Sequence, residues 1–295
     1  MQRIFLLVGT NLAILFILNI VLQLFGVGDW LSHSGSDLNI TGLLVISLVF
    51  GFAGSFISLA LSKTIAKRTM GVKIIEEPRN RNEKWLLDTV ASQAEKADIG
   101  MPEVGIFDSP QPNAFATGMS RNNALVAVST GLLMSMDADE VEAVLGHEVS
   151  HVANGDMVTL TLIQGVLNTF VIFFSRIIGH IVDRVILKSN NYGIGYFMTV
   201  LFAQMVLGVL ASIVVMWFSR RREFHADYGG AELAGKEKMI AALKRLQSQS
   251  EAKDLPREMA AFGISGNMGG SLARRLFSSH PPLEDRISAL ENTEL

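Results

Sequence analysis

Long runs without charged residues dominate the hydropathy pattern of this chain, and charged, polar stretches separate them. A helix needs about 20 mostly apolar residues to cross a bilayer. We therefore predict transmembrane helices over residues 4–28, 38–62, 157–181 and 194–219. Arg176 lies inside the third of these, from where its long side chain can reach the membrane interface. The third and fourth helices form either a full hairpin across the bilayer or one that crosses only in part.

Basic residues at the ends of these runs predict the orientation. The cluster after the second run consists of Lys63, Lys67, Arg68 and Lys73. The loop over 29–37 has no Lys or Arg, whereas Arg220 to Arg222 follow the fourth run. Cytoplasmic loops are enriched in Lys and Arg, so we predict that both termini and the polar regions face the cytoplasm.

The run over 4–28 also fits a cleaved signal peptide, since Arg3 supplies a positive charge before it. However, the run is too long for the core of a signal peptide, and no A-x-A-like cleavage site follows it. We expect a retained anchor.

The polar regions, residues 70–156 and 220–295, predict a cytoplasmic domain of mixed α and β structure. An amphipathic pattern predicts a helix over 82–97, and short apolar runs between Pro, Gly and Asn predict strands. The strand candidates are Val104–Phe107, Ala114–Thr117 and Ala124–Ser129. A strand edge flanked by Asn113 and Phe115 can hold an extended substrate by backbone pairing. The alternative is a small sheet that only packs on the helix.

A helix with defined ends is predicted between Asp137 and Gly155. Asp137 and Glu140 have the spacing of a capping box, and valines and a leucine recur at helical intervals behind them. Asn154-Gly155 is a typical helix stop.

This helix carries the pattern H-E-x-x-H. His147 and His151 are four residues apart, so they lie on one face of the helix and can share a metal ion. Glu148 then stands beside the metal, where it can accept a proton from the attacking water as a general base. The pattern is typical of zinc proteases.

A catalytic zinc site takes a third protein ligand. A metzincin would have a histidine at position 157, where this chain has Met157, so that subclass is excluded. After the fourth apolar run, Glu223 and Asp227 share one helical face. We predict that Glu223 binds the metal and that Asp227 accepts a hydrogen bond from a zinc histidine. The alternative is a salt-bridged helix start after three arginines.

Taken together, the motifs resemble the HtpX family of bacterial membrane zinc proteases, with the type I CAAX prenyl proteases as more distant relatives. The resemblance covers the whole chain and depends on HEVSHVANGD, RRREFHAD, PNAFATG and SSHPPLEDRI between and after the apolar runs. It implies an α-helical integral membrane protein with a cytoplasmic α+β catalytic domain of the zincin-like, gluzincin type. It further implies an endopeptidase of the bacterial cytoplasmic membrane that cleaves misfolded or damaged membrane proteins during heat and envelope stress. Its zinc ligands are then His147, His151 and Glu223, with one Zn²⁺ per chain and Glu148 as the base.

Two further residues belong to the last of these motifs. His280 near a zinc ion could stabilise the oxyanion of the reaction, or it merely precedes a helix that starts at Pro281-Pro282. Arg286, with Asn113 and Phe115, is a candidate for substrate binding. The segment 251–279 is rich in Gly, Ser and Met and either contacts substrate or is only flexible.

Composition narrows the classes of function. Hydrophobic residues make up 49% of the chain and charged residues 18%, as expected for a membrane protein. The net charge of −3 gives no electrostatic reason to propose nucleic acid as a partner. The chain has no cysteine, which excludes thiolate ligands. An ion transporter is an alternative, although the apolar runs offer few ionisable groups. A second alternative is a scaffold protein with a structural zinc, and such a site would need a fourth protein ligand.

Overall fold

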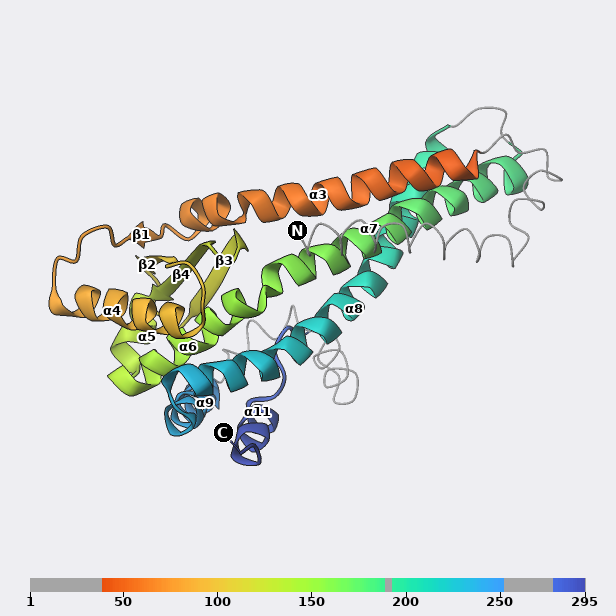
Figure 1. Cartoon of the computed structure of the whole chain (residues 1–295). Helices are drawn as coiled ribbons and strands as arrows, with labels where there is room; N and C mark the ends of the chain where they lie inside the picture. The colour runs from red at the N-terminus through yellow and green to blue at the C-terminus, as the bar shows by residue number, and fades with distance from the viewer. Residues whose placement is uncertain (1–38, 189–192, 252–277, 295) are drawn as a thin grey trace. The chain divides into compact units, whose positions relative to one another are not determined.

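A computed structural model describes residues 39–188, 193–251 and 278–294 (Figure 1). The predicted helix over 4–28 lies outside these residues, as does nearly all of the segment 251–279. The chain forms two compact units. One consists of Met1–Ile57 with Thr161–Val215, and the other of Ser58–Leu160 with Met216–Leu295.

Three helices in the described part of the chain are long and apolar enough to cross a membrane. They are α3 (Ile40–Thr69), α7 (Asp156–His180) and α8 (Ile194–Ala234), and they overlap the second, third and fourth predicted spans. A short π-helix, η1 (Ile181–Ile186), continues α7. Helix α8 extends well past its apolar run, through Gly229 and Gly230, and ends at Ala234, just before Gly235, whose φ is 110°.

Small residues allow α3 and α7 to pack closely in the first unit. A Cβ atom on Gly51 would lie 2.5 Å from Oγ1 of Thr169, and one on Gly165 would lie 2.7 Å from the ring of Phe52. Such close approach through small residues is usual between membrane helices. Asn168, a polar residue in the third predicted span, donates a hydrogen bond to Oγ of Ser55 at 3.2 Å. Its amide group therefore has a hydrogen-bond partner within the helix pair.

The second unit contains a four-stranded sheet in the order β1-β2-β4-β3. Its strands are β1 (Lys73–Ile74), β2 (Glu103–Phe107), β3 (Ala114–Ser120) and β4 (Asn123–Ser129). β2 and β4 are parallel, and the outer strands run antiparallel to their neighbours. Three strands occur where the short apolar runs predict them, with β3 longer than predicted, while the two-residue β1 is too short to leave such a signal. β3 is an edge strand of the sheet.

Helices α4 (Arg81–Lys96), α5 (Thr130–Ser135) and α6 (Ala138–Asn154) cover one face of this sheet (Figure 1). Behind them, α9 (Lys236–Glu251) packs on α6, and α11 (Leu283–Glu291) packs on α9. Val104, Val126 and Val128 point from the sheet into the shared core, where they meet Leu86 of α4 and Leu145 of α6. The opposite face carries a smaller cluster around Phe107 and Leu125. The alternation of side chains along the strands thus fixes which face supports α6.

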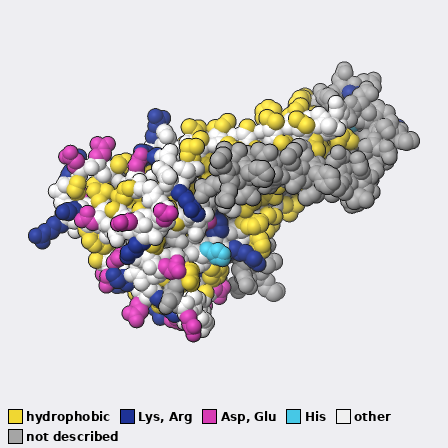
Figure 2. Space-filling view, in the orientation of Figure 1, with side chains coloured by type: hydrophobic (Ala, Val, Ile, Leu, Met, Phe, Trp, Pro, Cys, Tyr) yellow, Lys and Arg dark blue, Asp and Glu magenta, His cyan; other side chains and the backbone are white. Residues whose placement is uncertain are grey.

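The surface differs between the two units. Figure 2 shows acidic and basic side chains gathered over the second unit, whereas the described helices of the first present hydrophobic ones. Phe50, Phe202 and Met205 are each more than half exposed. Such exposed apolar surface on long helices is expected where lipid replaces water as the solvent.

Candidate metal centre

The ends of α6 are stabilised as the sequence predicts. Oδ1 of Asp137 accepts a hydrogen bond from the backbone N of Glu140 at 2.9 Å, and Oε2 of Glu140 accepts one from the backbone N of Asp137 at 3.0 Å. This capping box is confirmed. Gly155 ends the helix in the left-handed conformation with φ of 69° and ψ of 34°. These two signals hold the intervening H-E-x-x-H residues in helical phase.

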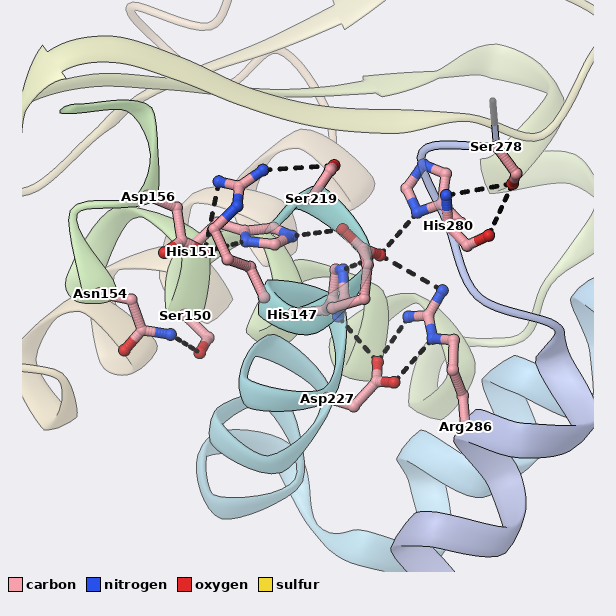
Figure 3. A network of polar contacts seen from close by, with 12 residues as sticks. His147, Ser150, His151, Asn154, Asp156, Ser219, Asp227, Ser278, His280 and Arg286 are labelled. Atoms are coloured by element: carbon pink, nitrogen blue, oxygen red, sulfur yellow. Dashed lines mark hydrogen bonds and ion pairs between the residues drawn. The ribbon is translucent and has the colours of Figure 1, made fainter. Parts of the chain in front are cut away.

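His147 and His151 lie together on one face of α6, with their ring centroids 4.7 Å apart (Figure 3). Glu223, from α8, lies against both rings. Its Oε2 is 3.6 Å from Nε2 of His147, and its Oε1 is 3.4 Å from Nε2 of His151. Ligand atoms of these three residues all lie within 4.8 Å of one another. The structure therefore brings together the three predicted ligands, from helices far apart in the sequence.

The other ring nitrogen of each histidine faces a carboxylate. Nδ1 of His151 lies 2.6 Å from Oδ2 of Asp156, and Nδ1 of His147 lies 2.9 Å from Oδ1 of Asp227, although the latter contact is not a well-aligned hydrogen bond (Figure 3). Histidines that bind metals usually donate their second N–H to such a partner, which fixes the tautomer. The two Nε2 atoms thus both face Glu223, and the donor set fits a divalent metal.

Asp156 was not predicted as part of the site. It follows the Asn154-Gly155 stop directly, and the left-handed Gly155 turns the chain so that Asp156 begins α7 beside His151. The sequence does show an acidic residue directly after the glycine that ends the helix. It does not show in which direction the chain continues after that glycine, and this direction brings Asp156 to His151.

Electrostatics keep Glu223 ionised. Burial raises the pKa of this carboxyl group, but hydrogen bonds with His151 and His280 outweigh burial and lower it far below its ordinary value. Burial lowers the pKa of His151, whereas Asp156 and Glu223 raise it, with a net value of about 9. A divalent cation bound by His151 would displace a proton from its imidazole, because histidine binds a metal in the neutral form.

Arg286, on α11, supplies a buried positive charge. Its Nε and Nη2 donate to the two carboxylate oxygens of Asp227 at 2.7 and 2.5 Å, and its Nη1 lies 3.4 Å from Oε2 of Glu223. Burial raises the pKa of Asp227, but the hydrogen bonds from Arg286 and the nearby imidazole of His147 lower it below its ordinary value. Arg286, predicted as a substrate-binding residue, thus holds two carboxylates of the site.

His280 also contacts Glu223. Its Nδ1 lies 2.6 Å from Oε2 of Glu223, while 61% of its side chain stays exposed. Pro282 is the N-cap of α11, so the motif also starts the last helix, as the alternative held. His280 therefore has a position beside the metal ligands, and its role in stabilising an oxyanion stays a prediction.

A cavity of about 450 Å³ opens beside two of the three predicted ligands. Glu148 lines it together with His147 and Glu223, and Asn113 and Ala114 border it from the start of β3. Phe115 does not line this cavity. Its ring packs on Phe107, with centroids 5.5 Å apart, on the opposite face of the sheet. Of the two residues predicted to flank the substrate strand, the cavity includes Asn113 alone.

Comparison with known proteins agrees with this geometry. The family model described as Peptidase family M48 matches residues 80–294. Over 99% of both chains, the protein is 63% identical to Protease HtpX of Thioalkalivibrio sulfidiphilus and 63% identical to the Protease HtpX homolog of Nitrosomonas europaea. The crystal structure of S. mikatae Ste24p has a similar fold, with a TM-score of 0.64 and 18% identity, over 94% of this chain and 66% of that one. The chain is therefore a multi-pass membrane metalloprotease and belongs to peptidase family M48.

Proposed function

We propose that this protein is a zinc-dependent endopeptidase in which Glu148 acts as general base. The observation that carries the proposal is the convergence of His147, His151 and Glu223, with Glu148 lining the adjoining cavity. Two imidazole nitrogens and one carboxylate are a ligand set typical of catalytic zinc. A zinc ion held there supplies an acidic water and polarises the peptide carbonyl.

The residues around the ligands have separate roles in this proposal. Glu148 accepts a proton from the water that attacks the carbonyl and passes it to the leaving amine. Asp156 and Asp227 hold the two histidines in the tautomer that binds through Nε2. His280 lies beside the proposed ligand Glu223. From there its exposed imidazole can donate a hydrogen bond to the carbonyl oxygen and stabilise the negative charge that develops on it.

The edge strand β3 supports binding of an extended polypeptide. Its only partner among the described strands is β4, so its outer edge can pair with a substrate backbone. Binding through the backbone depends little on side chains, which suits a protease that acts on unfolded segments. We propose that misfolded or damaged membrane proteins are the substrates. The basic residues after the second and fourth predicted spans support a location on the cytoplasmic side of the inner membrane.

The test is a comparison of Glu148→Gln with the unchanged protein in detergent or in lipid vesicles. Both should bind one zinc per chain in metal analysis, because the ligands are intact. Cleavage of an unfolded protein should fall by at least about a hundredfold in the variant, since a general base contributes roughly 10²–10⁴ in rate. Equal cleavage by the two proteins would contradict the proposed role of Glu148.

A further inference from the structure

Another cavity, which we call the Trp–Arg pocket, lies where the apolar run of α8 ends. Its volume of about 460 Å³ is within the usual range for ligand pockets. Helix α8 contributes Trp217, Arg220, Arg221 and Phe224, which have the i, i+3, i+4, i+7 spacing of a single helical face. The rest of the lining comes from residues between 278 and 285, before and at the start of α11. Two guanidinium groups and two aromatic rings thus share one hollow.

The sequence of α8 indicates that this pocket lies at a membrane interface. Trp217 is in the last turn of the fourth predicted span, and three arginines follow it at positions 220–222. Trp217 is 43% exposed and Phe218 is 36% exposed. Tryptophan is enriched where the hydrocarbon core meets the lipid headgroups, and clustered basic residues attract anionic headgroups there. The ligand most accessible to this part of α8 is therefore a phospholipid.

The neighbouring arginines Arg221 and Arg222 have different surroundings. Nη1 of Arg222 lies 3.7 Å from Oδ2 of Asp156, so this residue belongs to the metal centre. The guanidinium carbon of Arg221 lies 4.3 Å from the centroid of the Trp217 ring, in a cation–π arrangement. Within the described parts of the chain, no carboxylate forms an ion pair with Arg221. Its positive charge is therefore held over an aromatic ring and is available to an anionic ligand.

The lining of the pocket extends to the metal centre. Nη1 of Arg220 donates a hydrogen bond to the carbonyl oxygen of Ser278 at 2.8 Å. Oγ of Ser278 donates to the carbonyl oxygen of His280 at 2.6 Å, and Nδ1 of His280 lies 2.6 Å from Oε2 of Glu223 (Figure 3). His280 lines both this pocket and the cavity beside Glu148. A ligand in the pocket therefore lies next to a residue that contacts a proposed metal ligand.

We propose that the Trp–Arg pocket binds the phosphate group of an anionic phospholipid from the bilayer that α8 crosses. The fork of N–H groups on a guanidinium matches the oxygens of a phosphate. The rings of Trp217 and Phe224 provide apolar surface for the glycerol backbone and the first carbons of the acyl chains. Asp285 also lines the pocket, so one carboxylate stands against two guanidinium groups. A glycerol headgroup suits this lining, because its hydroxyls can donate to the carboxylate.

The test is native mass spectrometry of the full-length protein in detergent. Phosphatidylglycerol or phosphatidylcholine with the same acyl chains is added stepwise, and the dissociation constant of the first bound lipid is measured for each. The unchanged protein should bind phosphatidylglycerol about fivefold or more tightly than phosphatidylcholine. This is the effect expected from one arginine near an anionic surface. Equal affinity for the two lipids would overturn the proposal.

Two arginines that follow predicted spans provide a matched pair of variants. Arg221→Gln should weaken the first phosphatidylglycerol about fivefold and leave phosphatidylcholine unaffected. Arg68 is also exposed and follows the second predicted span, but it does not line the pocket, so Arg68→Gln should bind both lipids as the unchanged protein does. Trp217→Leu keeps an apolar side chain but removes the ring beneath Arg221. It should weaken phosphatidylglycerol about two- to fivefold, and it decides the test if Arg221→Gln does not fold.

The controls separate this pocket from general attraction to the membrane surface and from a site for free anions. Equal weakening by Arg221→Gln and Arg68→Gln would overturn the pocket, because any basic residue would then serve. Inorganic phosphate at the concentration of the lipid should not displace phosphatidylglycerol, since it has no chain to bury against the aromatic rings. Displacement would overturn the assignment to a lipid. None of these measurements involves proteolysis, so this inference and the proposed function are tested independently.

Discussion

In the candidate metal centre, basic and acidic side chains are paired. Each ligand histidine faces a different aspartate, and Arg286 joins the Asp227 and Glu223 carboxylates. Asp227, Glu223 and Arg286 are at most 6% exposed. Buried charges are costly unless they are paired and hydrogen-bonded, so the guanidinium is part of what allows two carboxylates beside the histidines.

Asp156→Asn tests this arrangement at the scale of one residue. The variant removes the negative charge that orients His151 but leaves the three ligands in place. We expect zinc affinity to fall by about 10- to 100-fold, as for other partners of metal-binding histidines. A competition titration with a chelator of known affinity measures the change.

Asp139→Asn is the control for this variant. Asp139 lies on α6, the helix of His151, but its side chain is 68% exposed and pairs with Lys238. The Asp139→Asn variant should bind zinc with the affinity of the unchanged protein. Equal affinities for all three proteins would show that Asp156 does not position His151.

At the scale of elements, the junction of α6 and α7 connects a ligand-bearing helix to a predicted span. Gly155 adopts a φ of 69°, which L-residues with a Cβ atom rarely adopt, and its N–H bonds to the carbonyls of His151 and Val152. The same turn brings Asp156 back to His151. The glycine thus both ends the helix and sets the orientation of a ligand.

Gly155→Ala should destabilise the protein by about 1–2 kcal/mol, the usual cost of the left-handed conformation for a residue with a Cβ. Gly155→Asn should cost less, because asparagine tolerates this conformation. Thermal unfolding of the three proteins in one detergent at one scan rate measures the order. An alanine variant as stable as the unchanged protein would indicate that the turn can rearrange.

At the scale of the whole molecule, the metal joins parts of the chain that are far apart in sequence. His147 and His151 precede the third predicted span, whereas Glu223 follows the fourth. An ion bound by both α6 and α8 therefore links these helices in the folded state. Binding to the folded state alone stabilises a protein in proportion to the logarithm of ligand concentration over Kd.

Removal of zinc by a chelator should lower the unfolding temperature. With zinc at a hundredfold excess over Kd, the stabilisation lost is about 2.7 kcal/mol. Differential scanning calorimetry with and without chelator measures the shift. Glu148→Gln should show the full shift, because its ligands are intact, while His147→Ala should show little. A full shift in His147→Ala would mean that the stabilising ion binds elsewhere.

Much of this protein is determined by local sequence. The long apolar runs, the capping box at Asp137, the glycine stop at 155 and the i, i+4 phase of His147 and His151 depend on residues within a few turns of one another, so periodicity predicts them. Glu223 and Asp227 share a helical face for the same reason. Only the tertiary structure decides that Glu223 lies against both histidines, that Asp156 and Arg286 belong to the site, that Phe115 packs away from the cavity, and that α9 lines it. These contacts join residues distant in the chain, and they depend on the direction in which each helix leaves its turn and on how side chains fill the shared core, which no pattern of neighbouring residues specifies.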